Sequence, residues 1–318
     1  MEIMKLIPSG KDYLWGGTRL KDEYGKRIDM TPLAESWECS VHPDGPCYVA
    51  NGRYKGKTLK EVLDEHPEYI GTKANGEFPI LAKFIDAKKD LSVQVHPDDE
   101  YAQEHEGDNG KTEMWYIIDA DEGASLIYGF KHKVTKEILE RAIEKGELDK
   151  HLQKVEVHKG DLFFVPAGTV HGIGKGILLA EIQESSNVTY RVYDYDRVDK
   201  NGKKRELHFD KAVQVMDMGI APDIKRKKRL VKYYPGCSRE LLCRCKYFET
   251  ERIQVTKGFS FSVMENSFQV LMCLDGYGQV EVDGDKPVRF SKGETVFLPA
   301  GIGRCLIIGD TSVLKIRC

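Results

Sequence analysis

Two histidines, a glutamate and a glutamine stand where short strands could bring them together. The stretch "LSVQVHPDDEY" contains Gln94 and His96, and residues two apart in a strand point to the same side. Glu113 lies near the start of the next apolar run, "GKTEMWYIID", and His171 follows the turn "VPAGT". We therefore predict that these four side chains converge from neighbouring strands.

Such a group would offer two imidazoles, one carboxylate and one amide oxygen, without a thiolate. This ligand mixture suits Zn²⁺ or another divalent first-row metal, with a position left for water or substrate. Each residue alone has a simpler explanation: His96 as a turn residue, His171 as a hydrogen-bonded core histidine, Glu113 as an edge-strand charge. Their joint occurrence at strand spacing favours a metal site.

The turn that precedes His171 occurs twice in the chain. "VPAGTVHGIG" begins at Val165 and "LPAGIGRCLI" at Leu298, an offset of 133 residues (298 − 165). At this offset Arg304 stands in place of His171. The second copy therefore lacks a ligand, and we expect it to serve in packing and shielding, with a regulatory pocket as the alternative.

A second pair of similar stretches lies upstream of each turn. "EMWYIIDADEGASLIYG" and "QVLMCLDGYGQVEVDG" align at an offset of 156 residues (274 − 118), which places Gln269 opposite Glu113. The two offsets differ by 23 residues (156 − 133), so the first copy carries an insertion. The inserted "VTKEILERAIEKGELDKHL" has helical apolar spacing and Thr135 as a plausible N-cap, which predicts a helix.

Short strands separated by Gly and Asp turns fill the rest of both copies. This spacing, as in "VEVHKGDLFFVPAG", indicates an antiparallel sandwich or small barrel. We predict a mainly β chain with two antiparallel barrels and a few inserted α-helices. The expected division is an N-terminal catalytic domain at 1–234, with its barrel core at about 78–200, and a C-terminal domain at 235–318.

Composition excludes several classes of function. The net charge of −3 gives no indication of nucleic-acid binding, and no apolar run is long enough to span a membrane. The start, "MEIMKLIPSGKDYLWGG", lacks the apolar core of a signal peptide. Eight cysteines without a C-x-x-C pair are then expected as reduced thiols in the cytoplasm.

Longer motifs resemble one enzyme family. Pro166-x-Gly168-x-x-His171 is similar to the second metal-binding motif of cupins. "QVHPDDEY", "GKTEMWYI", "GDLFFVPAGTVHGIGKG" and "QESSNVTYRVYDYDR" together resemble the short bacterial form of the type I mannose-6-phosphate isomerases. The likeness covers essentially the whole chain, including "YLWGG" near the start. Gln94 replaces the first histidine of the usual cupin H-x-H, which is itself a feature of this isomerase family.

The resemblance implies two cupin-type jelly-roll barrels and the interconversion of D-mannose 6-phosphate and D-fructose 6-phosphate through a cis-enediol or enediolate. It also implies one divalent ion per chain, expected to be Zn²⁺, and a sugar phosphate as the partner of a monomer or homodimer. The ion would act as a Lewis acid and template. Its ligands would be Gln94, His96, Glu113 and His171.

Three further residues match catalytic groups of the family. Arg191 would steady the enediolate or bind phosphate, unless it forms a salt bridge with Asp194 or Asp196. Glu181, within the mainly apolar "GILLAEIQ", is the favoured proton carrier, with an ordinary strand-end carboxylate as the alternative. Lys111 lies two residues before Glu113 and would share its face of the strand.

Two residues are candidates for the substrate pocket. Lys83 is a lone cation within "FPILAKFIDA", where burial without a purpose would be costly, and it matches a substrate-side lysine of the family. Trp15 would form a pocket wall or belong to the core.

Two other functions fit part of the pattern. Two histidines and one carboxylate also suit Fe(II), so a cupin dioxygenase is the first alternative. A non-catalytic sugar-phosphate sensor is the second. The cations Lys83, Lys111 and Arg191 favour a phosphorylated sugar over an apolar oxygenase substrate.

Overall fold

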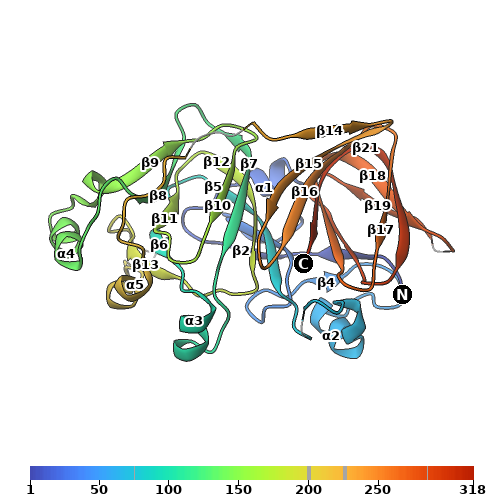
Figure 1. The fold of residues 1–318 in the computed structure, drawn as a ribbon, viewed down its shortest axis with the longest axis horizontal. Coiled ribbons are helices and arrows are strands. Elements are labelled where there is room, and N and C mark those ends of the chain that lie inside the picture. Colours follow the sequence, from blue (N-terminus) through green and yellow to red (C-terminus); the bar gives the residue numbers. More distant parts are fainter. Residues whose placement is uncertain (75, 199–201, 225–227, 285) are drawn as a thin grey trace. The chain divides into compact units, whose positions relative to one another are not determined.

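The computed structural model describes residues 1–74, 76–198, 202–224, 228–284 and 286–318. The chain forms two compact units, each built mainly from antiparallel strands (Figure 1). The terminal unit comprises Met1–Lys11, Thr18–Phe84 and Lys227–Cys318, and the central unit comprises Asp12–Gly17 and Ile85–Arg226. The mainly β, antiparallel fold class is confirmed.

Each compact unit is assembled from segments that lie far apart in the sequence. Strand β1 (Met4–Ile7) pairs with β20 (Thr295–Leu298), so the start of the chain folds with its end. Strand β5 (Ile80–Ala87) begins in the terminal unit and ends in the central one. The domain boundary at residue 234 stays a prediction.

The central unit contains two sets of antiparallel strands. The first has the order β10 (Leu162–Val165), β7 (Glu113–Ala120), β12 (Ile177–Glu184). The second has the order β13 (Tyr190–Tyr193), β6 (Val93–Val95), β11 (His171–Ile173), β8 (Ser125–Phe130), β9 (Leu152–Glu156). The strands alternate side chains between their two faces, and one face packs with the helices into a buried core that includes Val93, Val95 and Ile127.

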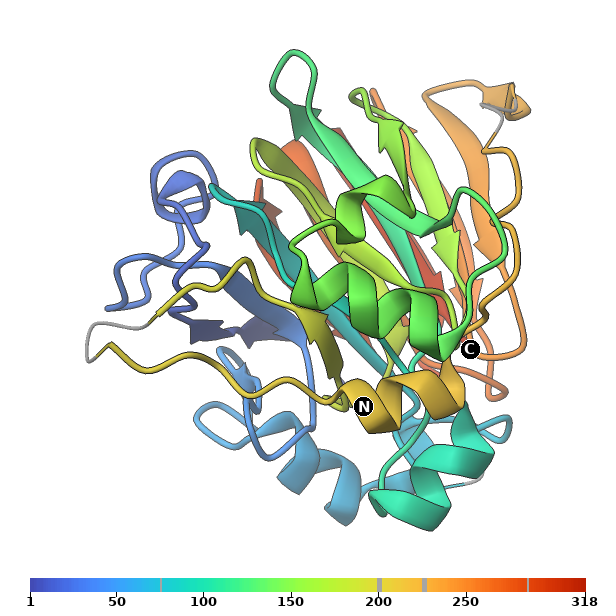
Figure 2. The same cartoon turned by 90° about the vertical axis from the view of Figure 1, so that its left-hand side faces the viewer.

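Helices of the central unit cover part of that core. The predicted helix is present as α4 (Lys136–Glu144), and the side chain of Thr135 caps it by accepting a hydrogen bond from the Ile138 N–H. A short 3₁₀ turn (Leu148–Lys150) follows, and α3 (Asp99–His105) and α5 (Phe209–Val215) complete the set. Figure 2 shows α4 in green and α5 in gold in front of the strands, where Leu139 and Ala212 enter the core.

The terminal unit is built on one large sheet. Its order is β14 (Val231–Tyr234), β15 (Cys237–Arg244), β16 (Glu249–Val255), β21 (Gly303–Arg317), β18 (Gln269–Val282), β20, β1, β4 (Tyr48–Val49). Strands β17 (Gly258–Val263) and β19 (Val288–Ser291) pair with β21 and β18, and β2 (Ser9–Lys11) pairs with β3 (Glu35–Cys39).

The described residues of the terminal unit include the α-helices α1 (Arg19–Asp22) and α2 (Leu59–Glu65) and a 3₁₀ turn at Pro67–Tyr69. Thr58 and Glu61 form a capping box at the start of α2, because each side chain bonds the other's backbone N–H. None of the helices that the structure describes is long and apolar enough to cross a membrane.

Candidate active site

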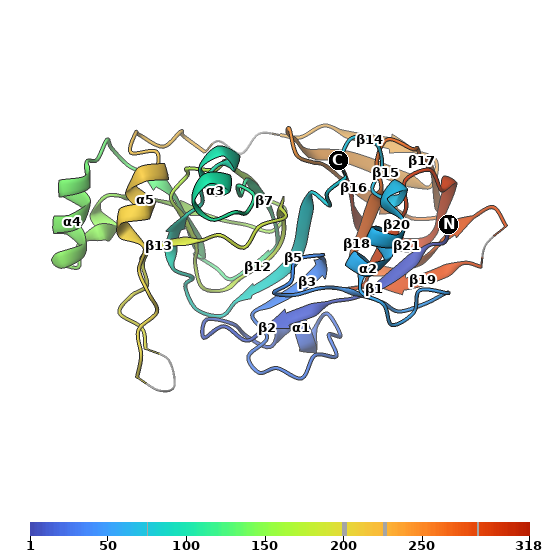
Figure 3. The same cartoon turned by 90° about the horizontal axis from the view of Figure 1, so that it is seen from below.

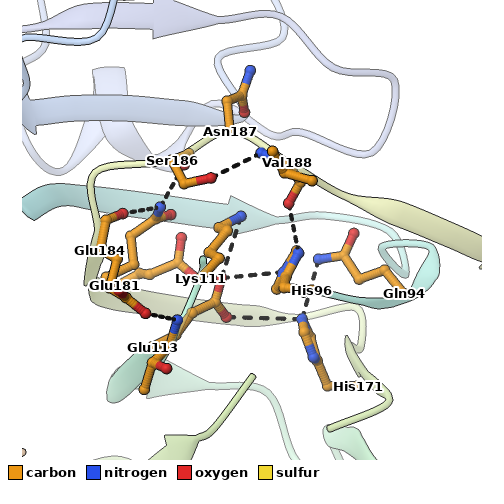
Figure 4. A network of polar contacts seen from close by, with 12 residues as sticks. Gln94, His96, Lys111, Glu113, His171, Glu181, Glu184, Ser186, Asn187 and Val188 are labelled. Atoms are coloured by element: carbon orange, nitrogen blue, oxygen red, sulfur yellow. Dashed lines mark hydrogen bonds and ion pairs between the residues drawn. The ribbon is translucent and has the colours of Figure 1, made fainter. Parts of the chain in front are cut away.

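Strand pairing in the central unit brings the four predicted metal ligands together. Gln94 on β6 lies directly opposite His171 at the start of β11, and His96 follows β6 by one residue. Glu113 is the first residue of β7. The close-up in Figure 4 shows their side chains turned toward one another.

His96, Glu113 and His171 form a compact cluster. Nε2 of His96 lies 3.3 Å from Oε1 of Glu113, and Nε2 of His171 lies 3.8 Å from Oε2. One ligand atom from each residue can be chosen so that all lie within 4.8 Å of one another. Each residue is only 1% exposed. Among the described residues, this is the group of three or more such side chains that could hold a metal ion.

Backbone carbonyl groups fix which ring nitrogen carries the hydrogen. Nδ1 of His96 lies 2.8 Å from the Val188 oxygen, and Nδ1 of His171 lies 2.8 Å from the Thr169 oxygen. A carbonyl can only accept, so each Nδ1 must donate, and Nε2 keeps its lone pair when the ring is neutral. Both lone pairs then belong to the nitrogens that face Glu113, as metal-binding histidines require.

Burial favours the neutral form of both rings. It is the main cause that lowers the pKa of His96 well below its ordinary value, and Lys111 and His171 add to the effect. Burial also lowers the pKa of His171, although Glu113 opposes the shift. Neutral imidazoles are the form that binds a metal ion.

The cluster fits a divalent metal ion. Nε2 of His96 is buried, and the described part of the chain supplies it with no hydrogen-bond partner. Buried polar atoms are normally satisfied, and a metal ion bound at Nε2 would satisfy this one. Gln94 presents Nε2 to His171 at 3.3 Å, while its Oε1 accepts from Ser92. Ligation through Oε1 therefore requires a half turn of the amide, and Gln94 as a ligand stays a prediction.

The Pro-x-Gly turn explains how His171 enters the cluster. Gly168 has φ of +83°, a conformation that residues with a Cβ rarely adopt. Its N–H donates to the His96 carbonyl at 2.8 Å, and the Thr169 N–H donates to Pro166 at 3.1 Å. The turn thus ties the backbone of one histidine to the segment that delivers the other.

Lys111 and Glu181 lie beside the cluster, as Figure 4 shows. Nζ of Lys111 is 3.3 Å from Oε1 of Glu113, and the side chain is buried. Glu181 on β12 is also buried, and its Oε1 accepts a hydrogen bond from Nε1 of Trp115 at 2.8 Å. The structure therefore places a cation and a second carboxylate at the candidate metal site, while their catalytic roles stay predictions.

Arg191 does not form the salt bridges considered as its alternative role. On β13 it lies opposite Gln94, and its Nη1 donates to the Glu206 carbonyl at 2.9 Å. Asp194 instead pairs with Arg197 and Arg205, and Asp196 pairs with Lys204. Nε of Arg191 is buried, with no hydrogen-bond partner among the described residues. The role of Arg191 in binding an anionic group stays a prediction.

The two predicted substrate residues lie apart from these contacts. Lys83 is buried in the terminal unit, where its Nζ is 3.6 Å from Oε2 of Glu35 and 5.1 Å from the Trp37 ring centroid. Trp15 belongs to the central unit, is 3% exposed and packs on Tyr13 with ring centroids 5.5 Å apart. Neither contact tests a role in substrate binding, so both stay predictions.

Sequence reasoning missed several contributors to the site. The carbonyl groups of Val188 and Thr169 act through the backbone, so no side-chain motif could reveal them. Glu184, three residues beyond Glu181, accepts from the Thr112 N–H at 2.7 Å. Burial, supported by Asp99, raises its pKa to about 8. A second acidic residue in the apolar strand β12 was the signal that could have identified it.

Comparison with known proteins places these features in a family. A model described as "Phosphomannose isomerase type I, catalytic domain" matches residues 3–128, and one described as "Mannose-6-phosphate isomerase, cupin domain" matches residues 239–317. Mannose-6-phosphate isomerase ManA of Bacillus subtilis is 41% identical over 303 residues, which cover 95% of this chain and 94% of that protein. A mannose-6-phosphate isomerase of Streptococcus mutans is 40% identical over 301 residues, 95% and 93% of the two chains.

A solved structure agrees with the sequence matches. The crystal structure of the mannose 6-phosphate isomerase from Bacillus subtilis has a TM-score of 0.92 with this chain at 38% sequence identity. The similarity covers 99% of each chain.

Proposed function

The chain belongs to the type I phosphomannose isomerase family, and we propose that it interconverts D-mannose 6-phosphate and D-fructose 6-phosphate at the His96–Glu113–His171 cluster. The observation that carries this proposal is the cluster itself: two neutral imidazoles and one carboxylate, all buried and facing one another.

The proposed cofactor is one Zn²⁺ per chain, held by Nε2 of His96, Nε2 of His171, the Glu113 carboxylate and Oε1 of Gln94. When bound, the ion would supply Lewis-acid charge and a template for the sugar oxygens. Two imidazoles and two oxygen donors match the ligands that Zn²⁺ accepts. Nδ1 of each histidine is already held by a carbonyl, so the ligands are oriented before the metal binds.

Glu181 is the proposed proton carrier between C1 and C2 of the sugar. Its Oε1 accepts a hydrogen bond from the Trp115 N–H, which orients the carboxylate, and a carboxylate in this place is suited to accept and return a proton. Lys111 lies near enough to Glu113 to contribute positive charge or a hydrogen-bond donor at the same place. A general acid or base at this position allows the proton to move on one face of the enediol.

Arg191 is proposed to bind anionic oxygens of the substrate, either the phosphate or the enediolate. A guanidinium group binds such oxygens through paired N–H donors, and its charge does not depend on pH in the working range. Lys83 and Trp15 are proposed as parts of the substrate pocket.

A coupled isomerase assay combined with elemental analysis tests the proposal. We expect purified protein to convert mannose 6-phosphate to fructose 6-phosphate, to lose activity with a chelator and to regain it with Zn²⁺. Activity that persists in a fully metal-free preparation would contradict the metal role. Oxygen consumption with iron bound would favour the dioxygenase, and substrate binding without turnover in metal-replete protein would favour the sensor. A cytoplasmic location and a monomeric or homodimeric state stay predictions.

A further inference from the structure

The segment 205–208 holds Arg191 at both its backbone and its guanidinium group. The Arg191 N–H donates to Nδ1 of His208 at 3.2 Å, and the His208 N–H donates to the Arg191 carbonyl at 2.8 Å. Nη1 of Arg191 donates to the Glu206 carbonyl at 2.9 Å. In Figure 3 this segment is the yellow chain that leads directly into α5.

Asp194, three residues along the chain, is a competitor for that guanidinium group. Burial and the charge of Arg205 lower the pKa of Arg191, whereas the negative charge of Asp194 opposes the shift, so this carboxylate lies within electrostatic reach. Arg205 binds both of its carboxylate oxygens, with Nε 2.8 Å from Oδ2 and Nη2 2.6 Å from Oδ1. Arg197 also donates to Oδ1. Although burial opposes the shift, Arg205 and Arg197 lower the pKa of Asp194, so the carboxylate stays charged and fully occupied.

This arrangement matters because a guanidinium group prefers a carboxylate partner whenever one is within reach. An Asp194 released from Arg205 would compete with the substrate for Arg191. With Asp194 occupied, Nε of Arg191 stays buried without a hydrogen-bond partner among the described residues. A donor kept in that state costs stability, which is consistent with a reserved binding position.

We propose that Arg205, Glu206 and His208 form a positioning segment for Arg191. Arg205 pairs with Asp194, so that the Asp194 carboxylate does not form a salt bridge with Arg191. Glu206 and His208 orient Arg191 toward an anionic oxygen of the substrate. The inference rests on the proposed function, because it assigns these residues to the same reaction.

The first test removes Arg205, the partner of Asp194, and then also removes the negative charge of Asp194. Arg205→Met should lower kcat/KM for mannose 6-phosphate by roughly tenfold or more, mainly through KM if Arg191 binds phosphate. The double variant Arg205→Met/Asp194→Asn should regain most of the loss, because no carboxylate remains to capture Arg191. Lys204→Met, which removes a neighbouring exposed charge paired with Asp196, is the matched control and should retain normal activity.

The second test replaces the acceptor of the Arg191 N–H. His208→Asn keeps an acceptor atom at the position of Nδ1 and should retain most activity, whereas His208→Leu should lower kcat/KM. A purely structural role for the ring would make both variants fail together. Metal content and Tm, measured for every variant, identify any loss that comes from unfolding.

A readout that does not need turnover separates this inference from the proposed function. The NMR signal of the Arg191 Nε–H, assigned with Arg191→Lys, should shift in Arg205→Met and return in the double variant. If the wild type lacks isomerase activity, the proposed function fails, and the NMR comparison still decides the inference. An unchanged Nε–H signal and unchanged activity in Arg205→Met would overturn it.

Discussion

The two copies of the Pro-x-Gly turn have the same backbone but different side chains. In the central unit, the Gly168 N–H donates to the His96 carbonyl at 2.8 Å; in the terminal unit, the Gly301 N–H donates to the Met264 carbonyl at 3.1 Å. The two glycines have φ of +83° and +79°. The hydrogen bond identifies Met264 as the counterpart of His96.

Strand register identifies the other counterparts. His171 lies opposite Gln94, and Arg304 lies opposite Ser262. Glu113 lies opposite Val165, and Gln269 lies opposite Leu298. Leu298 corresponds to Val165 at the repeat offset of 133 residues (298 − 165). The four site positions of the central unit therefore correspond in the terminal unit to Ser262, Met264, Gln269 and Arg304.

The exposure of these side chains differs as much as their chemistry. His96, Glu113 and His171 are 1% exposed, whereas Met264 is 64% exposed and Ser262 and Arg304 are also exposed. Gln269 is buried, but its Nε2 donates to the Ser262 carbonyl at 3.2 Å. The comparison shows that the barrel backbone alone does not make a metal site, because the ligands and their shielding from water are separate properties of the sequence.

The largest expected effect comes from removing one ligand. His171→Ala should abolish bound metal and lower kcat by at least roughly a thousandfold, because the proposed ion would serve as both Lewis acid and template. Arg304→Ala at the corresponding position should change neither quantity. Elemental analysis and the coupled assay compare the two variants, and normal metal content in His171→Ala would remove the proposed site.

Glu181→Gln should lower kcat by roughly 10²- to 10⁴-fold while metal content stays normal, because the amide cannot carry the proton. Single-turnover and steady-state assays of metal-replete protein check this expectation. If Glu181→Gln turns over at the wild-type rate, Lys111 becomes the candidate proton carrier, and Lys111→Met is the variant to measure next.

Gly168→Ala and Gly301→Ala compare the two turns directly. Each places a Cβ at positive φ, which costs about 1–2 kcal/mol. The new Cβ at 168 would also lie 3.0 Å from the Val215 oxygen, whereas the one at 301 would meet Glu265 only at 3.4 Å. We expect both to lower Tm, but only Gly168→Ala to weaken metal binding. Equal metal affinity in the two variants would contradict the link between turn and site.

The smallest effect concerns Glu184, whose pKa is raised to about 8 mainly by burial. The folded state keeps its proton between about pH 4.3, where the unfolded carboxyl ionises, and pH 8, so stability falls across this window as pH rises. Glu184→Gln cannot ionise and should be more stable than wild type at pH 8.5 but not at pH 4. A gain of about 1 kcal/mol would raise Tm by roughly 2–4 °C. Equal Tm differences at both pH values would contradict this account.

The sequence by itself determined the local features. Strand alternation, the Pro-x-Gly turn and the Thr135 cap are set by residue types within a few positions, so the β fold and the inserted helix followed from them. The sequence also showed that Gln94 and His96 share one face of a strand and that the second copy lacks a counterpart of His171. Both features are patterns of side chains along the chain.

Only the tertiary structure decided the long-range contacts. The sequence left open whether Arg191 pairs with Asp194. In the structure, Asp194 accepts hydrogen bonds from Arg205 and Arg197 instead. It also shows that carbonyl groups orient both cluster histidines and that β1 folds with the end of the chain. These contacts depend on which strands pair and in what register. The backbone groups involved are the same in nearly every residue, so the residue types in the sequence do not reveal which of them will form these contacts.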